Sequence, residues 1–493
     1  MRYTIYLFLI VLFSNVLAQP SRRQSITLQQ TVSIASDSSL ASFKAGNLYL
    51  SDYWQYRTYK AERLPGLSLG MTPVSYGNNI VKRYDSQTNT DVYKSQQNWY
   101  SHANLTLSQN MDITGGTFFI DTELGYLRNM GLKQNEQFTS VPVRIGYSQA
   151  LFGYNRFRWQ RKLEPLKYEK AKKDLLYNME EISEQAASLF FDLALSQTRY
   201  SLAQQNIANN DTLYRIGQER YKIGSISQSD LLTLKLSLLN ANSESGNAVL
   251  NLRKASFALS DYLRIDKETL FQPELPSTPL NITITSDEAI RLARENNPRL
   301  PEIKKMILEA QQNLDKARKE NRFAASVSAS VGFNQVSNTL TEAYHKPLQQ
   351  DVVSVSLNVP IIDWGVRKGK VNIAQRDLNA VNITAHQAEQ AFEQDVRITV
   401  DEFNFRQSQL QSANEAREIA QLAYGKAKQL FFVGKADVNS VNLAVSRQIE
   451  TELNYIITLK GYWLSYYKIR KLTLYDFVKR STISAEFDQI SGF

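Results

Sequence analysis

Cysteine is absent from this chain of 493 residues, and histidine occurs only three times. The absence of cysteine excludes a disulfide scaffold, a thiolate metal site, a cysteine nucleophile and a lipid anchor on cysteine. His386 and Glu389 lie three residues apart on a predicted helix, but no third metal ligand accompanies them. The sequence also lacks a nucleophile elbow, a phosphate-binding loop and a dinucleotide fingerprint. We therefore expect neither an enzyme nor a bound cofactor or metal.

Long apolar runs are missing except at the N-terminus. Residues 1–18 contain a basic start, an apolar stretch and the small-residue pattern Val16-Leu17-Ala18, which is typical of a secretory signal peptide. The mature chain would begin near Gln19. No later segment reaches the roughly 18 apolar residues that a transmembrane helix needs. An exported protein of this kind is soluble, bound to a surface, or inserted as a β-barrel, and without cysteine we expect no lipid anchor.

The excess of positive charge is small, with 57 Lys and Arg against 48 Asp and Glu. Basic and acidic residues alternate along predicted helices, as in KYEKAKKD from Lys167 to Asp174. This pattern is typical of a solvated helix face and not of a nucleic-acid surface. We expect no nucleic-acid partner.

Proline is absent from residues 166–272 and again after Pro360. The lack of proline predicts a long helix in each stretch, and apolar residues recur at spacings of three and four along the first. A helix from Leu166 to Ile223 would be about 90 Å long at 1.5 Å per residue. Such a helix needs neighbours of similar length. A shorter helical pattern in residues 289–317 is interrupted by Asn297-Pro298, where we expect a break or a kink.

An internal repeat organises the chain. Gly224 follows Gly153 by 71 residues, and Gly434 follows Asp363 by the same distance, so one offset of 210 relates both landmarks. We predict a first repeat at residues 19–280, a second at 281–478 and a C-terminal tail at 479–493. The expected strand regions are about 66–150 and 325–360, and the expected helical hairpins are about 155–265 and 365–475.

The strand regions alternate apolar with small polar residues, as in SVSASVGF from Ser326 and DVVSVSLNVP from Asp351. This period of two gives one apolar and one polar face, as a membrane β-barrel requires. The first repeat has 83 residues between Gly66 and Ser148, where the second uses 34 between Ala325 and Asn358. The insertion is either another strand pair or a large loop.

Gly224 and Gly434 end the two long helices. Glycine permits the left-handed cap, and Ser227 or Asp437 can cap the returning helix. The sequence therefore predicts two αα-hairpins with tight tips.

Four phrases together resemble the TolC family of outer-membrane efflux channels. They are DEAIRLARENNPRL from Asp287, VPIIDWGVRKGKV from Val359, SQALFGYNR from Ser148 and RYKIGSISQSDLL from Arg220. The likeness covers about residues 24–478.

The resemblance implies an α+β membrane protein that forms a homotrimer in the outer membrane of a Gram-negative cell. Each protomer would give four strands to a shared 12-stranded β-barrel in outer-membrane lipid, and the helical hairpins would form a periplasmic α-barrel tunnel. Strand number supports oligomerisation independently, because bacterial barrels start at eight strands. The resemblance also implies two partners, a periplasmic adaptor and an inner-membrane pump of the resistance-nodulation-division type or the ABC type.

The tips are the candidate functional site. The resemblance implies that an adaptor docks around Tyr221, Gly224, Ser227, Asp230, Gly434 and Asp437. Acidic tip residues narrow the pore entrance in that family, and the candidates here are Asp230, Lys435 and Asp437. Ser440 and Leu443 stand where the second repeat would carry further acids, so a strong acidic ring is not expected. Asp230 and Asp437 can also be plain helix caps.

The expected function is that of a passive exit duct of a tripartite efflux system for small molecules. The alternative is the outer-membrane component of a type I protein secretion system, which uses the same kind of duct. A periplasmic coiled-coil scaffold without a pore is a weaker alternative, because it does not explain the alternating strands.

Overall fold

The computed structural model describes residues 23–130, 134–266, 270–276 and 282–487. The predicted signal peptide at residues 1–18 lies outside the described residues. The chain divides into two compact units. The first unit comprises residues 1–50, 172–299 and 390–493, and the second comprises residues 51–171 and 300–389.

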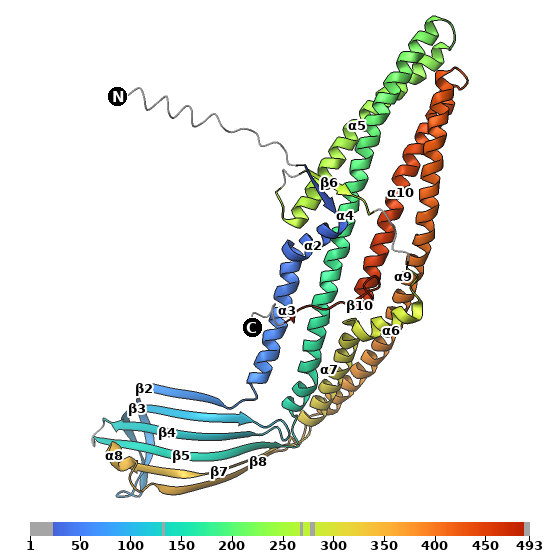
Figure 1. The fold of residues 1–493 in the computed structure, drawn as a ribbon. Coiled ribbons are helices and arrows are strands. Elements are labelled where there is room, and N and C mark those ends of the chain that lie inside the picture. The colour runs from blue at the N-terminus through green and yellow to red at the C-terminus, as the bar shows by residue number, and fades with distance from the viewer. Residues whose placement is uncertain (1–22, 131–133, 267–269, 277–281, 488–493) are drawn as a thin grey trace, which may run out of the picture. The chain divides into compact units, whose positions relative to one another are not determined.

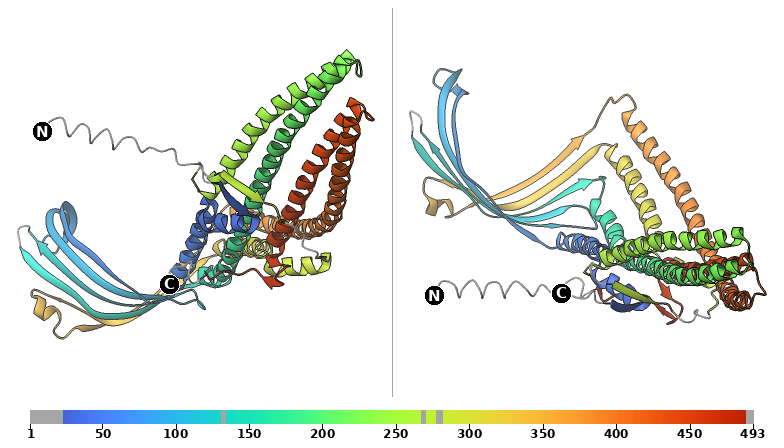
Figure 2. Two further views of the ribbon diagram at one scale, coloured as in Figure 1. Left: turned by 45° about the horizontal axis from the view of Figure 1, so that its top comes forward. Right: turned by 90° about the horizontal axis from the view of Figure 1, so that it is seen from above.

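One antiparallel sheet of six strands dominates the second unit (Figure 1). Its order is β2-β3-β4-β5-β7-β8. Neighbours in the sheet follow one another along the chain except β5 and β7, which pair although residues 152–323 lie between them. Figure 2 shows that the sheet is strongly curled. The strands are β2 (Gly66–Asp85), β3 (Thr90–Asn110), β4 (Thr117–Asn129), β5 (Asn135–Leu151), β7 (Ala324–Ser337) and β8 (Leu348–Asn358).

The prediction of four strands per chain is wrong for the described residues. The insertion in the first repeat forms strands, so four strands of this sheet precede the first long helix where two were expected. The turn between β3 and β4 contains Gly115 with φ of +79°, a conformation that glycine adopts at little cost. The alternating pattern of residues 101–127 therefore belongs to two strands, β3 and β4, joined by a turn.

The two faces of this sheet differ in polarity. Residues paired directly across neighbouring strands share a face. One face carries such pairs as Leu69 with Leu105 and Val327 with Val355. The opposite face carries Ser328 with Ser354 and the ion pair of Arg144 with Asp121, in which Arg144 Nε lies 3.0 Å from Asp121 Oδ1. An apolar face and a polar face thus run across all six strands.

The helical part of the second unit packs next to the strand ends. It consists of parts of α3 (Leu40–Ala61), α4 (Arg156–Lys222), α7 (Arg299–Glu320) and α9 (Val366–Phe432), with the short α8 (Leu340–Ala343) between β7 and β8. The rings of Tyr56 on α3 and Tyr168 on α4 stack at 4.5 Å. Trp159 on α4 donates from Nε1 to Asp315 Oδ2 on α7 over 2.8 Å.

Two long helical hairpins form most of the first unit. The first joins α4 to α5 (Gln228–Leu263), and the second joins α9 to α10 (Val438–Thr473). α4 and α9 have 67 residues each, and α5 and α10 have 36 each. α4 begins at Arg156, close to the expected start of the first hairpin at about 155, and contains Pro165 inside the helix. No helix in the described part of the chain is both long and apolar enough to cross a membrane.

Shorter elements complete the first unit. They are β1 (Arg23–Thr27), α2 (Leu28–Ser38), β6 (Leu270–Glu274), α6 (Ser286–Asn296), β9 (Tyr475–Asp476) and β10 (Ser481–Thr482). β1 pairs in parallel with β6, and β9 pairs with β10. The expected break at Asn297-Pro298 is confirmed, because α6 ends at Asn296 and α7 begins at Arg299.

A buried charge cluster joins α4 to α10 and to the segment after α10. Arg470 Nη2 lies 2.9 Å from Glu180 Oε1, and Arg470 Nη1 lies 3.3 Å from Asp476 Oδ2. Both carboxylates are buried, Glu180 at 4% exposure and Asp476 at 6%. Burial raises the pKa of Glu180, although the Arg470 charge opposes the shift. One guanidinium therefore compensates two carboxylates that have little access to water.

Replacing Arg470 by leucine is expected to lower the free energy of unfolding by about 3–5 kcal/mol, because two buried carboxylates lose their counter-charge. Urea unfolding followed by far-UV circular dichroism measures the change. Arg447→Leu, on an exposed position of the same helix, is the matched control and should change stability by less than about 0.5 kcal/mol. Equal stability of the two variants would contradict this role of Arg470.

Candidate functional site

The two hairpin tips end their first helices in the same way. Gly224 has φ of +70° and Gly434 has φ of +76°, which confirms the left-handed caps predicted for both. After α4, Gly224 N donates to Tyr221 O and Ser225 N donates to Arg220 O. After α9, Gly434 N donates to Phe431 O and Lys435 N to Leu430 O. This pair of bonds is a Schellman motif, which satisfies the last carbonyls of each helix.

Side-chain caps start the returning helices. Ser227 and Asp230 form a capping box, in which Asp230 N donates to Ser227 Oγ over 3.1 Å and Ser227 N donates to Asp230 Oδ2 over 3.0 Å. Asp437 caps α10 by accepting from Ser440 N over 2.6 Å. Both aspartates thus act as helix caps, and a further role at the pore entrance remains a prediction.

The caps also determine how these carboxylates titrate. Hydrogen bonds from Ser227 hold the pKa of Asp230 below its usual range, and hydrogen bonds from Ser440 do the same for Asp437. The negative charge of Asp437 slightly opposes the shift at Asp230. The two aspartates, one on each hairpin, are therefore close enough to interact and remain ionised at neutral pH.

An apolar cluster joins the two hairpins just behind the tips. Leu213 and Leu234 come from the first hairpin, and Phe431, Val438 and Val441 come from the second. Leu234, Phe431 and Val441 are each only 1% exposed. The two tips therefore pack against each other within one chain.

Arg220 adds a polar contact to this packing. Its Nη2 donates to the backbone carbonyl of Phe431 over 2.7 Å, and its guanidinium carbon lies 4.8 Å from the centre of the Phe431 ring. Phe431 O also accepts from Gly434 N within the second tip. Arg220 thus reaches from the last turn of α4 to the last turn of α9, and we call this contact the Arg220 latch.

The structure brings the candidate residues together in one region. Gly224, Ser227 and Asp230 lie on the first tip, and Gly434, Lys435 and Asp437 lie on the second. Tyr221 is 43% exposed on the last turn of α4, near a shallow groove that includes Ile216, Glu219 and Ile223. Arg220 and the apolar cluster were not predicted from sequence. The sequence signal for Arg220 was weak, because a basic residue in the last turn of a helix is common.

The chain belongs to the outer membrane efflux protein family, whose model matches residues 120–263 and 289–467. This finding confirms the resemblance to TolC-like efflux channels. The family is one of efflux proteins and not of enzymes, which confirms that the chain is not an enzyme. No curated protein matches the chain in sequence.

Solved structures share the fold at low sequence identity. The CmeC outer membrane channel of Campylobacter jejuni is 14% identical with a TM-score of 0.65, over 94% of this chain and 89% of that one. The outer membrane protein VceC of Vibrio cholerae is 14% identical with a TM-score of 0.64, over 90% and 96%. The MtrE outer membrane channel of Neisseria gonorrhoeae, in its open state, is 14% identical with a TM-score of 0.59, over 93% and 89%.

The caps make the tips sensitive to acid but not to changes near neutral pH. A carboxylate with a lowered pKa stabilises the fold above its unfolded value of about 3.9 and loses this effect as the pH falls through its folded pKa. Amide-exchange protection at the first turns of α5 and α10 should therefore be constant from pH 8 to 5 and fall below about pH 4. Hydrogen exchange with mass spectrometry measures it.

Asp437→Asn is the control, because its amide oxygen can still cap the helix without a charge. The loss of amide-exchange protection that acid causes at the first turn of α10 should be smaller in this variant. Loss of amide-exchange protection between pH 6 and 8 would show that groups other than Asp230 and Asp437 control the stability of the tips.

Proposed function

We propose that this chain is the outer-membrane exit duct of a tripartite efflux system. It would conduct small molecules passively from an inner-membrane pump and a periplasmic adaptor across the outer membrane. The observation that carries this proposal is the pairing of a two-faced, six-stranded sheet with two latched helical hairpins in one chain. Family membership and the fold support it.

The sheet supports a trimer, but with more strands than the 12 expected. β2 and β8 are its two edges, each with one neighbour in the described sheet. Five successive antiparallel pairings make β8 run opposite to β2. The β8 edge of one copy can therefore pair with the β2 edge of the next and keep the whole sheet antiparallel. Three copies would close a barrel of 18 strands.

The strand number determines the width of the proposed barrel. Strands lie about 4.8 Å apart and tilt by about 40° in a barrel. Eighteen strands then give a backbone diameter of roughly 36 Å, whereas twelve give roughly 24 Å. The outer-membrane part of the duct would be wide, and the tips would be the narrow point.

The apolar face of the sheet would contact lipid. Its outer end carries an aromatic row in which Tyr76 pairs with Trp99, and Tyr126 lies 5.0 Å from Phe138 between ring centres. From Phe118 to Tyr126 the strand rises about 27 Å along its own direction. With strands tilted by about 40° from the barrel axis, this corresponds to roughly 20 Å along that axis. This height is close to the apolar band of about 25 Å in outer-membrane barrels.

A second apolar belt follows β8 at the other end of the sheet. Ile361, Ile362 and Trp364 are 90%, 73% and 94% exposed in one loop before α9. Large apolar side chains so exposed fit the interfacial layer of a membrane better than water. The polar face, with its serines and the Arg144–Asp121 pair, would line the water-filled interior.

The hairpins would form the tunnel, and the tips would form its gate. The apolar cluster and the Arg220 latch hold the tips of one chain together, so opening must separate or twist them. A docking adaptor would open the gate by binding the open arrangement more tightly than the closed one. The proposed docking surface remains Tyr221, Gly224, Ser227, Asp230, Gly434 and Asp437, and Lys435 would line the entrance with the two aspartates.

The remaining expectations belong to this proposal. Residues 1–18 would direct export, and the mature chain would lie in the outer membrane of a Gram-negative cell, with its helices in the periplasm and no lipid anchor. The pump would be of the resistance-nodulation-division type, with an ABC pump as the other choice. The equal lengths of α4 and α9, and of α5 and α10, at an offset of 210 residues support the two-fold repeat.

The outer-membrane duct of a type I protein secretion system is the second candidate. The six-stranded sheet favours it to a degree, because a wider barrel would admit larger cargo. Genes beside this one would distinguish the two, since an ABC transporter with a secreted protein indicates secretion.

Arg220→Ala should release the latch and raise the open probability of the channel. Loss of a hydrogen bond from a charged donor, at about 1.5 kcal/mol, corresponds to roughly a tenfold shift toward the open gate. Single-channel recording of the purified trimer in a planar bilayer measures it.

Arg215→Ala is the control. Arg215 is exposed and pairs with Asp211 on its own helix at 3.0 Å, so its removal should leave the currents unchanged. The same small conductance in both variants would show that Arg220 does not hold the gate.

A further inference from the structure

Every connection at one end of the six-stranded sheet exposes a large apolar side chain. At this end the helices of the second unit meet the strands (Figure 1). Leu64 before β2 and Phe152 after β5 are each 67% exposed, and Ile113 between β3 and β4 is 85% exposed. Trp364 after β8 is 94% exposed. We call these residues, together with Phe323, Ile361 and Ile362, the junction belt.

Basic residues lie next to this belt along the chain, on each of the four helices that join the sheet. Fifteen basic and two acidic residues fall in four short ranges, which are 57–63 at the end of α3, 156–162 at the start of α4, 316–322 at the end of α7 and 367–376 at the start of α9. Neither α4 nor α9 has an acidic residue in its first turn. We call these four ranges the basic collar. Its net charge is strongly positive, although the excess over the whole chain is small.

Acidic neighbours compensate a part of the collar. Arg63, Lys319 and Arg367 form ion pairs of 2.6–3.1 Å with aspartates that lie outside it. Lys316 lies 4.0 Å from Glu320, one of the two acids within it. The basic residues still outnumber these carboxylates by a wide margin.

The remaining charge is exposed to solvent. Arg158 and Arg161 lie three residues apart on one face of α4, and Lys368 and Lys370 lie near the start of α9. All four side chains are exposed, and no acidic residue occurs in the ranges 156–162 and 367–376. These cations are therefore available to an anion from outside the chain.

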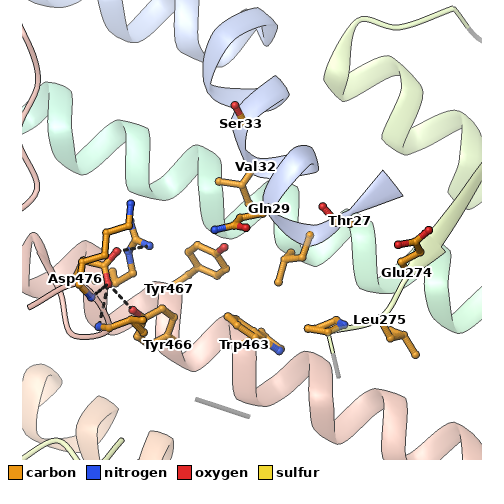
Figure 3. A pocket seen from close by; sticks show the side chains of 15 residues that line it. Thr27, Gln29, Val32, Ser33, Glu274, Leu275, Trp463, Tyr466, Tyr467 and Asp476 are labelled. Atoms are coloured by element: carbon orange, nitrogen blue, oxygen red, sulfur yellow. Dashed lines mark hydrogen bonds and ion pairs between the residues drawn. The ribbon is translucent and has the colours of Figure 1, made fainter. Parts of the chain in front are cut away.

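Charge in the first unit is arranged differently. Arg470 lies against two buried carboxylates. Figure 3 shows one of them, Asp476, beside Tyr466, whose hydroxyl donates to it over 2.9 Å. That guanidinium needs no external partner. The excess of exposed cations is thus a property of the collar and not of every basic residue in the chain.

The sequence of belt and collar along each helix selects the kind of partner. The belt continues the apolar face of the sheet, which would contact lipid in the proposed duct, and the collar follows the belt. A membrane surface has the same order, with acyl chains first, then the interfacial layer that suits large apolar side chains, then charged headgroups. A soluble anion would match the collar but leave the belt in water.

We propose that the basic collar and the junction belt together bind anionic phospholipid, with the headgroup phosphate on the collar and the acyl chains against the belt. The proposal rests on the proposed duct, which places this end of the sheet at the membrane surface facing the helices. Arg158 and Arg161 would donate in pairs to phosphate oxygens, and the lysines would act as point charges. Each cation close to an anionic surface strengthens binding about fivefold.

Lipid retention by the detergent-purified, full-length protein tests the proposal. Native mass spectrometry counts the lipids that the protein retains from micelles containing equal amounts of dioleoyl-phosphatidylglycerol and dioleoyl-phosphatidylcholine. The protein should prefer phosphatidylglycerol at least about tenfold. The preference should fall when ammonium acetate is raised from about 50 to about 500 mM, because salt screens exposed charges.

One variant combines Arg158→Gln, Arg161→Gln, Lys368→Gln and Lys370→Gln. It should lower the preference for phosphatidylglycerol at least about fivefold and leave the retention of phosphatidylcholine unchanged. Trp364→Ser should instead lower the retention of both lipids by a similar factor, because it removes an apolar contact and no charge.

Lys426→Gln combined with Arg447→Gln is the matched control. These two exposed cations lie near the other end of α9 and on α10, so their removal should change the retention of neither lipid.

Three results would overturn the proposal. They are equal retention of the two lipids by the wild type, an unchanged preference in the four-residue variant, or displacement of phosphatidylglycerol by an equal concentration of glycerol 3-phosphate, which would indicate a site for a free phosphate. The mass of the assembly and its single-channel currents are measured on the same samples. A conducting trimer without lipid preference contradicts the collar proposal alone, whereas a monomer that never conducts contradicts the proposed duct.

Discussion

Unpaired strand edges are the constraint on which the rest of this molecule depends. A strand at the edge of a sheet exposes backbone N–H and C=O groups, and in a membrane these groups must find partners within protein. The six-stranded sheet has two such edges and one face that carries such apolar pairs as Leu69 with Leu105 and Val327 with Val355. Six strands are too few to close on themselves, since bacterial barrels start at eight. Other copies of the chain are the natural partners, because β8 has the direction that β2 needs. Backbone chemistry therefore favours association of several copies, and the proposed trimer is a closure of this kind.

The helical hairpins meet a different requirement. The two tips of one chain share an apolar cluster and the Arg220 latch, which the proposed gate would have to separate on opening. A gate must be stable when closed and must still open when a partner binds. The contacts that close it should therefore be few and local. One cluster and one latch would satisfy this condition, because the proposed adaptor would need to offset only a few kcal/mol to shift the population. By contrast, the Arg470 cluster holds α4 to α10 with compensated buried charges and would keep the hairpins joined while the tips move.

Sequence patterns predicted the local features of this fold better than the long-range ones. Glycine at 224 and 434, and proline at 298, act on their own backbone, so the caps and the helix break were predictable. The insertion before Ser148 was ambiguous, because alternation alone does not distinguish a membrane strand from a long loop, and two strands per chain were missed. Arg220 was missed because its acceptor, the Phe431 carbonyl, lies 211 residues away. The basic collar was missed for a related reason, because its four ranges are far apart along the chain and come together only at the end of the sheet.

Cysteine cross-linking between the sheet edges tests the central claim most directly, since the chain contains no cysteine of its own. Leu69 on β2 and Val355 on β8 lie on the apolar face of the two edge strands. In the proposed trimer, β8 of each copy would lie beside β2 of the next copy. In one chain β3, β4, β5 and β7 separate them. Oxidation of the double variant Leu69→Cys with Val355→Cys, and of neighbouring pairs two residues along, should give covalent trimers in at least one register. Each single variant should remain monomeric on a denaturing gel. Monomers in every register, from a protein of monomeric mass in detergent, would contradict the shared barrel.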